Sequence, residues 1–240
     1  MQSTATVRAL DRRWYPEFGD NWDDELFRLR ILARLQSSMV VLDLGAGAGI
    51  VRQMDFRSAS VRVCGLDLDP RVLSNPHLHE AMVGSAEAIP WGDRQFDLVF
   101  ADNVLEHLPD PERAFREIHR VLKPGGSFLA KTPNKWHYMP LIARLTPHRF
   151  HRFINRLRGR EDQDTFPTCY RANSRRTIRR LAATTGFAVE QLSLIEGRPE
   201  YLRLSPVTYF GGLAYERLVN ASRHLECLRI LLIMELRRTA

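Results

Sequence analysis

A short apolar run that leads into a glycine-rich turn constrains the fold of this chain more than any other feature. Residues 39–44 (MVVLDL) contain one charged side chain and are followed at once by GAGAG, residues 45–49. An apolar run of this length predicts a strand that is buried on both faces, as in a parallel sheet. Glycines in the turn after it permit a tight bend and allow a ligand to approach the backbone closely.

Further segments alternate between strand and helix patterns. Residues 61–66, 96–101 and 127–131 are predicted as strands two, four and five, and the weaker run 81–83 as strand three. Apolar positions predict one helix over 22–35 and another that begins at Pro111, is capped by Asp110 and stops at the KPGG sequence of 123–126. Parallel strands require crossover connections, so the pattern predicts an α/β fold with a doubly wound, mostly parallel, Rossmann-like sheet.

The second half of the chain adds two strands and two helical inserts. Ser174 is suited to cap a helix that runs through Thr185 and ends at Gly186. Residues 187–195 and 229–236 are predicted as strands six and seven, with an apolar helix over 206–220 between them. We therefore expect a seven-stranded sheet with inserts after strands five and six. The expected organisation is one domain over 1–240, with a cofactor-binding core (39–131), an inserted substrate or lid segment (132–173) and a C-terminal part (174–240).

A second motif indicates a nucleoside-containing ligand. Asp67 follows strand two, 22 residues after Gly45, where a carboxylate can accept hydrogen bonds from ribose hydroxyls. Dinucleotide-binding enzymes share this arrangement, but here Ile50 stands where their GxGxxG pattern has its third glycine. The segments GSAEAIP (84–90) and NVLEH (103–107) follow strands three and four, so all four motifs are expected at one edge of the sheet.

The motifs VVLDLGAGAG, GLDLDP, GSAEAIPWGDRQFDLVFADNVLEHLPD and REIHRVLKPGGSFLAKTPN, in order over residues 39–134, resemble those of the class I S-adenosylmethionine (SAM)-dependent methyltransferases. The resemblance implies SAM as the cofactor. It also implies the cofactor-binding residues Asp43, Gly45, Ala46, Gly47, Asp67, Leu68, Ser85, Ala86 and Asn103. Many members have an aspartate in place of Ser85, which leaves Glu87 as an alternative partner for the adenine amino group.

Methyl transfer from a sulfonium is a direct displacement, so no covalent nucleophile is required. An oxygen acceptor must lose a proton, and His107 is the first candidate for the base, with His137 and Tyr138 as weaker ones. The alternative is that His107 only shapes the turn. The motifs favour a small-molecule, lipid or glycan acceptor, modified at oxygen. An RNA methyltransferase, a nicotinamide-dependent oxidoreductase and a SAM-binding module without catalysis are the other hypotheses.

The formal charge of +7 favours an anionic partner, and eleven arginines between residues 141 and 181 keep nucleic acid as an alternative partner. Arg149, Arg152, Arg156 and Arg158, together with the apolar segment 209–218, suggest peripheral contact with the inner face of a membrane. The alternative is an apolar helix packed on the domain. No secretory signal or membrane span is predicted, so we expect a cytoplasmic protein. The pairs His77/His79 and His148/His151 lack further ligands at zinc spacing, so no metal site is expected. The oligomeric state stays open.

Overall fold

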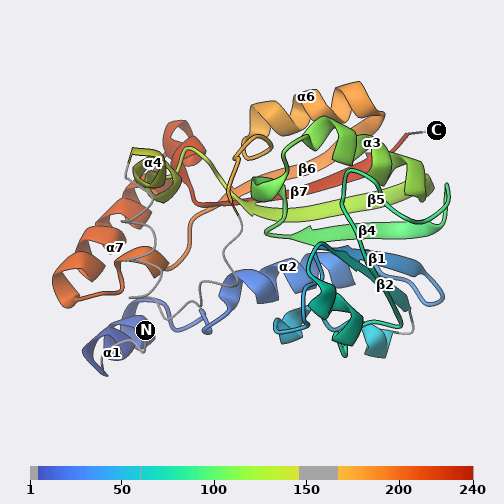
Figure 1. Cartoon of the computed structure of the whole chain (residues 1–240). Coiled ribbons are helices and arrows are strands. Elements are labelled where there is room, and N and C mark those ends of the chain that lie inside the picture. The colour runs from blue at the N-terminus through green and yellow to red at the C-terminus, as the bar shows by residue number, and fades with distance from the viewer. Residues whose placement is uncertain (1–4, 60, 146–166, 240) are drawn as a thin grey trace. The chain divides into compact units, whose positions relative to one another are not determined.

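The computed structural model describes residues 5–59, 61–145 and 167–239 (Figure 1). Contacts divide the chain into two compact units, each assembled from three stretches of sequence. Unit 1 comprises residues 1–22, 133–167 and 194–231, and unit 2 comprises residues 23–132, 168–193 and 232–240.

Unit 2 is built on a seven-stranded sheet with the order β3-β2-β1-β4-β5-β7-β6. The strands are β1 (Val40–Leu44), β2 (Arg62–Asp67), β3 (Glu80–Val83), β4 (Phe96–Asp102), β5 (Leu122–Pro133), β6 (Phe187–Ile195) and β7 (Leu231–Arg238). The first five strands in this order, from β3 through β2, β1 and β4 to β5, pair in parallel. The end of β7 lies beside the start of β6, where Thr239 N–H donates to the Gly186 carbonyl at 3.0 Å. Strand β7 is therefore antiparallel to β6, and the predicted seven-stranded, mostly parallel sheet is confirmed.

The two helices α3 (Pro111–Val121) and α6 (Arg175–Thr185) pack against each other in unit 2 (Figure 1). Asp110 caps α3 by accepting from the Arg113 N–H, and Ser174 caps α6 in the same way. Gly186 ends α6 in the left-handed conformation, with φ of 81°. The predicted limits of both helices are confirmed. They were predictable because the capping residues are recognisable in the sequence.

Other elements differ from the predictions. Helix α2 (Trp22–Leu32) ends three residues before the predicted limit at residue 35. The KPGG sequence does follow the end of α3, but it lies within β5 as a bulge that shifts the register against β4, with Gly125 at φ of 76°. In the described residues, the connections between β1 and β4 contain no helices other than 3-10 turns, so the first three crossovers lack the α-helices expected from strict alternation.

Unit 1 contains the helices α1 (Ala5–Trp14), α4 (Tyr138–Leu145) and α7 (Pro206–Ala221). Val7 and Tyr15 pack with Tyr209 and Leu213 of α7 in a buried cluster. Ser205 and Thr208 form a reciprocal capping box at the start of α7. The helix predicted between the last two strands is thus confirmed. Residues 146–166, which are half of the predicted insert 132–173, lie outside the described residues.

Across the described ranges, no helix is both long and apolar enough to cross a membrane.

Candidate functional site

The turn after β1 and the end of β2 are joined by hydrogen bonds at one edge of the sheet. The strands pair in parallel, so their carboxyl ends meet there. The Gly45 N–H donates to the Leu66 carbonyl at 2.7 Å. The Asp67 carboxylate accepts from the Gly47 N–H through Oδ2 and from the Asp69 N–H through Oδ1, both at 2.8 Å. The structure thus brings together the glycine turn and the acidic residue that the sequence singled out.

The three glycines of the turn have different environments. Gly45, Gly47 and Gly49 all have positive φ, at 82°, 50° and 73°. A Cβ at Gly45 would overlap the side chain of Val104, and one at Gly49 would also overlap neighbouring side chains. A Cβ at Gly47 would have only Asp67 Oδ2 near it, at 3.9 Å. Gly47 is therefore the glycine whose backbone faces open space, whereas packing accounts for the other two.

Asn75 supports the glycine turn and was missed by the sequence analysis. Its Nδ2 donates to the carbonyls of Ala46 and Gly47, at 2.9 and 3.2 Å, and its Oδ1 accepts from the His77 N–H at 2.9 Å. The side chain is buried. In the sequence, Asn75-Pro76 is typical of an ordinary turn, so no signal distinguished this asparagine from a loop residue.

Asp43 lies on β1 with its carboxyl group buried. Burial raises its pKa well above the usual range, and the neighbouring carboxylates of Asp102 and Asp67 raise it further. The Asp43 carboxyl therefore ionises only at a pH above its usual range. The role of Asp43 in ordering the glycine turn stays a prediction.

Asn103 follows β4 in the left-handed conformation, with φ of 53°. Its N–H donates to the Lys131 carbonyl at 2.9 Å, and its Nδ2 donates to Asp102 Oδ1 at 2.8 Å. The side chain is exposed at the same sheet edge as the glycine turn, where the motif placed it.

A buried ion-pair cluster lies next to Asn103. The Lys131 ammonium is fully buried and contacts Asp102 and Asp23, each at 3.0 Å, and also Asp24. Burial lowers the Lys131 pKa, but the three carboxylates outweigh it and raise the pKa overall. Burial raises the pKa of Asp102 to about 7, against the lowering effect of Lys131. Sequence reasoning missed this cluster because its acids on α2 are more than 100 residues from the lysine.

The residues assigned to the adenosine portion lie in the turns after β2 and β3. Leu68 is 63% exposed, while Ser85 and Ala86 are half-buried. The Ser85 Oγ accepts from the Glu87 N–H at 3.1 Å, and Glu87 Oε1 accepts from the N–H of Asp110 at 2.7 Å. Glu87 is thus engaged with the start of α3, and Ser85 shapes its own turn.

Glu106 anchors the loop that carries His107. Its buried carboxyl accepts from the Thr132 hydroxyl at 2.8 Å. The hydroxyl oxygen of Thr132 in turn accepts from Asn173 Nδ2 at 2.6 Å. The Glu106 carbonyl also accepts from the Cys169 N–H at 2.6 Å. Burial raises the Glu106 pKa. This network ties the ends of β4 and β5 to the segment before α6, and it leaves His107 half-buried at the sheet edge.

The weaker base candidate His137 is in unit 1 and is only 1% exposed. Its ring lies close to those of Tyr138, Tyr201 and Tyr215, with centroids 4.0 to 6.1 Å away. Burial lowers its pKa to about 3 and raises the pKa of Glu196, whose Oε2 lies 3.8 Å from His137 Nε2, to about 8. Both groups are therefore neutral near pH 7, and His137 is an interior residue of unit 1.

The histidines considered for a metal site have structural partners or fall outside the description. His77 Nδ1 lies 3.1 Å from Asp55 Oδ2, and His79 Nδ1 accepts from the Val63 N–H at 3.0 Å. His148 and His151 lie outside the described residues. In the part of the chain that the structure describes, no three His, Cys, Asp or Glu side chains are grouped to hold a metal ion.

Comparisons with known proteins agree with these motifs. Residues 42–130 match the model of a methyltransferase domain. A ubiquinone biosynthesis O-methyltransferase from Pseudomonas syringae pv. tomato is 31% identical over 156 residues, which are 55% of this chain and 62% of the relative. The chain thus matches less than two thirds of that relative's length.

Solved structures share the fold at lower identity. Phosphoethanolamine N-methyltransferase 2 from Haemonchus contortus has a TM-score of 0.58 at 17% identity, over 98% of this chain and 57% of that one. A [4+2]-cyclase has a TM-score of 0.57 at 19% identity, over 90% and 81% of the two chains. The fold alone therefore accommodates more than one chemistry. Through the matched domain model and the ordered motifs of unit 2, residues 42–130 of this chain are similar to the class I SAM-dependent methyltransferases.

Proposed function

We propose that this chain binds SAM at the glycine turn of unit 2 and transfers its methyl group to an oxygen of a small-molecule, lipid or glycan acceptor. The observation that carries the proposal is the hydrogen bond between Asp67 and Gly47, which places a carboxylate beside the glycine with an open backbone. Each carboxylate oxygen has a second lone pair, so Asp67 can also accept from both ribose hydroxyls. The residues proposed to hold the cofactor are the nine assigned from the sequence.

The electrostatics of the site favour SAM over a dinucleotide. Asp67 and Asp102 lie close enough to Asp43 to raise its pKa. A carboxylate at Asp67, beside the glycine turn, attracts a sulfonium or ammonium group and repels a diphosphate. Dinucleotide sites place the diphosphate at the N-terminus of an α-helix. Here the described residues between Gly49 and β2 contain only 3-10 turns, and the Gly47 N–H already donates to Asp67.

His107 is proposed as the general base. When bound, the cofactor supplies an activated methyl group on sulfur. The acceptor hydroxyl must lose its proton as the new bond forms, and an imidazole at the sheet edge can take it. The Glu106 network holds the preceding residue in the interior, so it fixes the loop that presents His107.

An oxygen acceptor is supported by the named activity of the Pseudomonas relative, an O-methyltransferase of ubiquinone biosynthesis. The acceptor of this chain is proposed only by class. The segments that differ most between folds of this kind carry the specificity, and here they include 132–173 and α7.

We also propose that α7 can contact a membrane surface. Its buried side includes Tyr209 and Leu213, as expected for a packed helix, but Val207, Phe210 and Leu218 are 83%, 47% and 59% exposed. Exposed apolar side chains beside cations suit the surface of an anionic bilayer. The four arginines invoked from the sequence, residues 149 to 158, lie outside the described residues. Peripheral association with the inner face of the membrane, in a cytoplasmic protein, stays a proposal.

An RNA acceptor is the second candidate. Arg176, Arg179 and Arg180 are exposed on α6, which gives unit 2 a cationic helix face. Phosphate contacts would make RNA binding fall steeply with salt, so binding at low salt that is lost as salt rises would favour this alternative.

The proposed activity is tested with labelled SAM and an extract of the producing cells. Wild-type protein is expected to transfer label to a small, extractable product, and Asp67→Ala to transfer much less. Label that appears only in RNA would contradict the small-molecule proposal and favour the RNA methyltransferase. If the protein binds SAM but labels no product, the result would favour a SAM-binding module without catalysis.

A further inference from the structure

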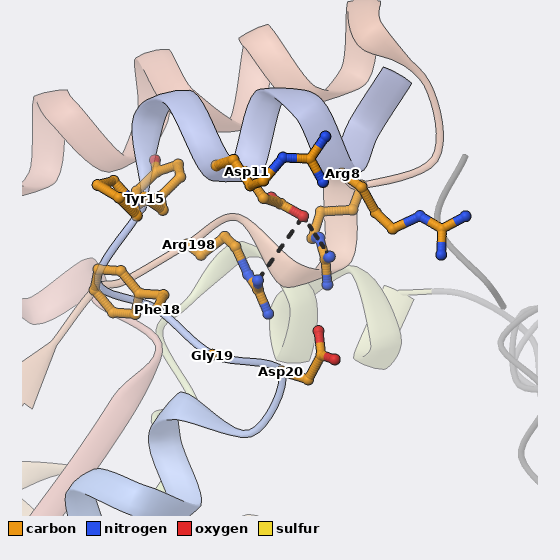
Figure 2. A pocket seen from close by; sticks show the side chains of 10 residues that line it. Arg8, Asp11, Tyr15, Phe18, Gly19, Asp20 and Arg198 are labelled. Carbon is orange, nitrogen blue, oxygen red and sulfur yellow. Dashed lines mark hydrogen bonds and ion pairs between the residues drawn. The ribbon is translucent and has the colours of Figure 1, made fainter. Parts of the chain in front are cut away.

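A small cavity of about 250 Å³ lies within unit 1, and none of the residues that line it is assigned to the cofactor. It is bounded by α1 and the turn after it, and by the segment that follows β6 (Figure 2). Figure 2 shows Arg198 extending toward Asp11 of α1, with Gly19 and Asp20 below it. The cavity is smaller than the pockets that bind drug-sized molecules, so it fits a headgroup or a small metabolite.

Two buried arginine donors that line this cavity lack a hydrogen-bond partner. Arg198 is 3% exposed, and its Nε donates to Glu200 Oε1 at 2.6 Å while its Nη1 lies 3.8 Å from Asp11 Oδ2. Its Nη2 is buried without an acceptor, and so is the Nε of Arg203. A buried, unpaired donor on a charged group is unfavourable. A ligand oxygen could accept the hydrogen bonds that these two donors lack.

The nearby carboxylates are already engaged. Asp11 accepts from Arg203 Nη2 at 2.5 Å and from the Tyr209 hydroxyl at 3.1 Å. Glu200 accepts from both arginines and from the Trp22 Nε1 at 3.1 Å. These acids hold the guanidinium groups in place.

The charge of the cavity also favours an anion. The arginines Arg8, Arg12, Arg198 and Arg203 face two lining carboxylates, Asp11 and Asp20, and one adjacent carboxylate, Glu200. One positive charge therefore remains, and it resides with the exposed arginines of α1. Within the described residues, no carboxylate pairs with Arg8 or Arg12. Tyr15 and Phe18 add an aromatic wall suited to the organic part of a ligand.

We propose that this cavity binds a phosphate ester, with Arg198 and Arg203 as the buried donors and Arg8 and Arg12 closing on it from α1. A tetrahedral phosphate offers acceptors in several directions, which suits donors that converge from α1 and from the segment after β6, whereas a carboxylate offers only one plane. The ester is either a soluble metabolite or the headgroup of an anionic lipid. The proposal goes beyond methyl transfer and does not depend on it.

The test measures binding of glycerol 3-phosphate to the full chain by calorimetry at constant ionic strength. In parallel, the protein is floated with phosphatidylcholine vesicles, with and without phosphatidic acid. We expect at least one probe to bind, and Arg198→Gln to weaken that binding at least tenfold. Binding of the soluble ester alone identifies a metabolite, and flotation with phosphatidic acid alone identifies a lipid headgroup.

A charge-matched pair of variants keeps the test decisive if Arg198→Gln does not fold. Arg8→Gln with Arg12→Gln removes two exposed cations from the cavity, and Arg13→Gln with Arg176→Gln removes two exposed cations elsewhere. The first pair should lose at least threefold more affinity than the second. Equal affinity of the two pairs, or no binding of either probe by the wild type, overturns the proposal.

Discussion

The glycines of the turn after β1 are required for different reasons. Gly45 is required because Val104 fills the space beside its α-carbon, whereas Gly47 leaves its α-carbon open. Both look alike in the sequence, as glycines of one GxGxG turn. Only packing distinguishes the glycine that the fold requires from the one with open space beside it, which is proposed to face the cofactor.

The first prediction separates these two glycines. Gly45→Ala should destabilise the protein by about 3 kcal/mol or more, because left-handed strain and a steric overlap add together. Gly47→Val should cost only about 1–2 kcal/mol of stability, from its left-handed φ, yet abolish SAM binding. Urea unfolding and calorimetry with SAM measure the two effects. Equal destabilisation, or a folded Gly47→Val that binds SAM normally, would contradict the geometry.

The second prediction concerns the base. If His107 removes the acceptor proton, His107→Ala should lower kcat by roughly a hundredfold and leave SAM affinity unchanged. Turnover is measured with the acceptor found by the labelling experiment. A decrease of less than about threefold would leave His107 with only a role in shaping the turn.

At the scale of elements, local chemistry predicted some boundaries and missed others. The caps Asp110, Ser174 and Gly186 set the limits of α3 and α6, and these limits were readable because capping depends on neighbours in sequence. The crossovers before β4 and the bulge in β5 depend on how long a connection must be and on how strands pair. Neither the connection length nor the strand pairing can be read from a short stretch of sequence.

The third prediction tests how elements are joined at the site. Thr132→Val removes the hydroxyl that donates to buried Glu106 and accepts from Asn173, so it should destabilise unit 2 by about 1–3 kcal/mol. Thr184→Val, at an exposed position of α6, is the matched control and should change stability by less than about 0.5 kcal/mol. Chemical unfolding compares the two. Similar effects of both substitutions would mean that the network contributes little.

At the scale of the whole molecule, the seven-stranded sheet and the meeting of the motifs at one of its edges were predictable, but the interior of unit 1 was not. The motifs that follow β1, β2, β3 and β4 occur in the same order in the sequence, so the sequence alone placed them at the ends of successive strands. His137 with Glu196, and Arg198 with Asp11, are pairs of residues far apart in the chain, so only the folded structure shows them. The single domain expected over 1–240 stays a prediction beside the two compact units.

The fourth prediction follows from Glu196, whose pKa burial raises to about 8. A raised carboxyl pKa stabilises the fold below the ordinary value of about 4.5, and that contribution is lost as the pH rises through 8. Glu196→Gln removes this dependence and keeps an acceptor for the Ile230 N–H. Between pH 5 and pH 8 the variant should gain a few kcal/mol relative to wild type. A difference in unfolding free energy that is constant with pH would refute the assignment.

The central claim, that unit 2 holds SAM through Asp67, is tested most directly by calorimetric titration with SAM and, separately, with NAD. Wild-type protein is predicted to bind SAM in the micromolar range and not to bind NAD. Asp67→Ala is predicted to weaken SAM by about 1.5–3 kcal/mol. Asp69→Ala, which removes the nearby carboxylate that accepts from the Arg71 N–H, should leave SAM affinity unchanged. Tighter binding of NAD than of SAM, or unchanged SAM affinity in a folded Asp67→Ala variant, would contradict the account.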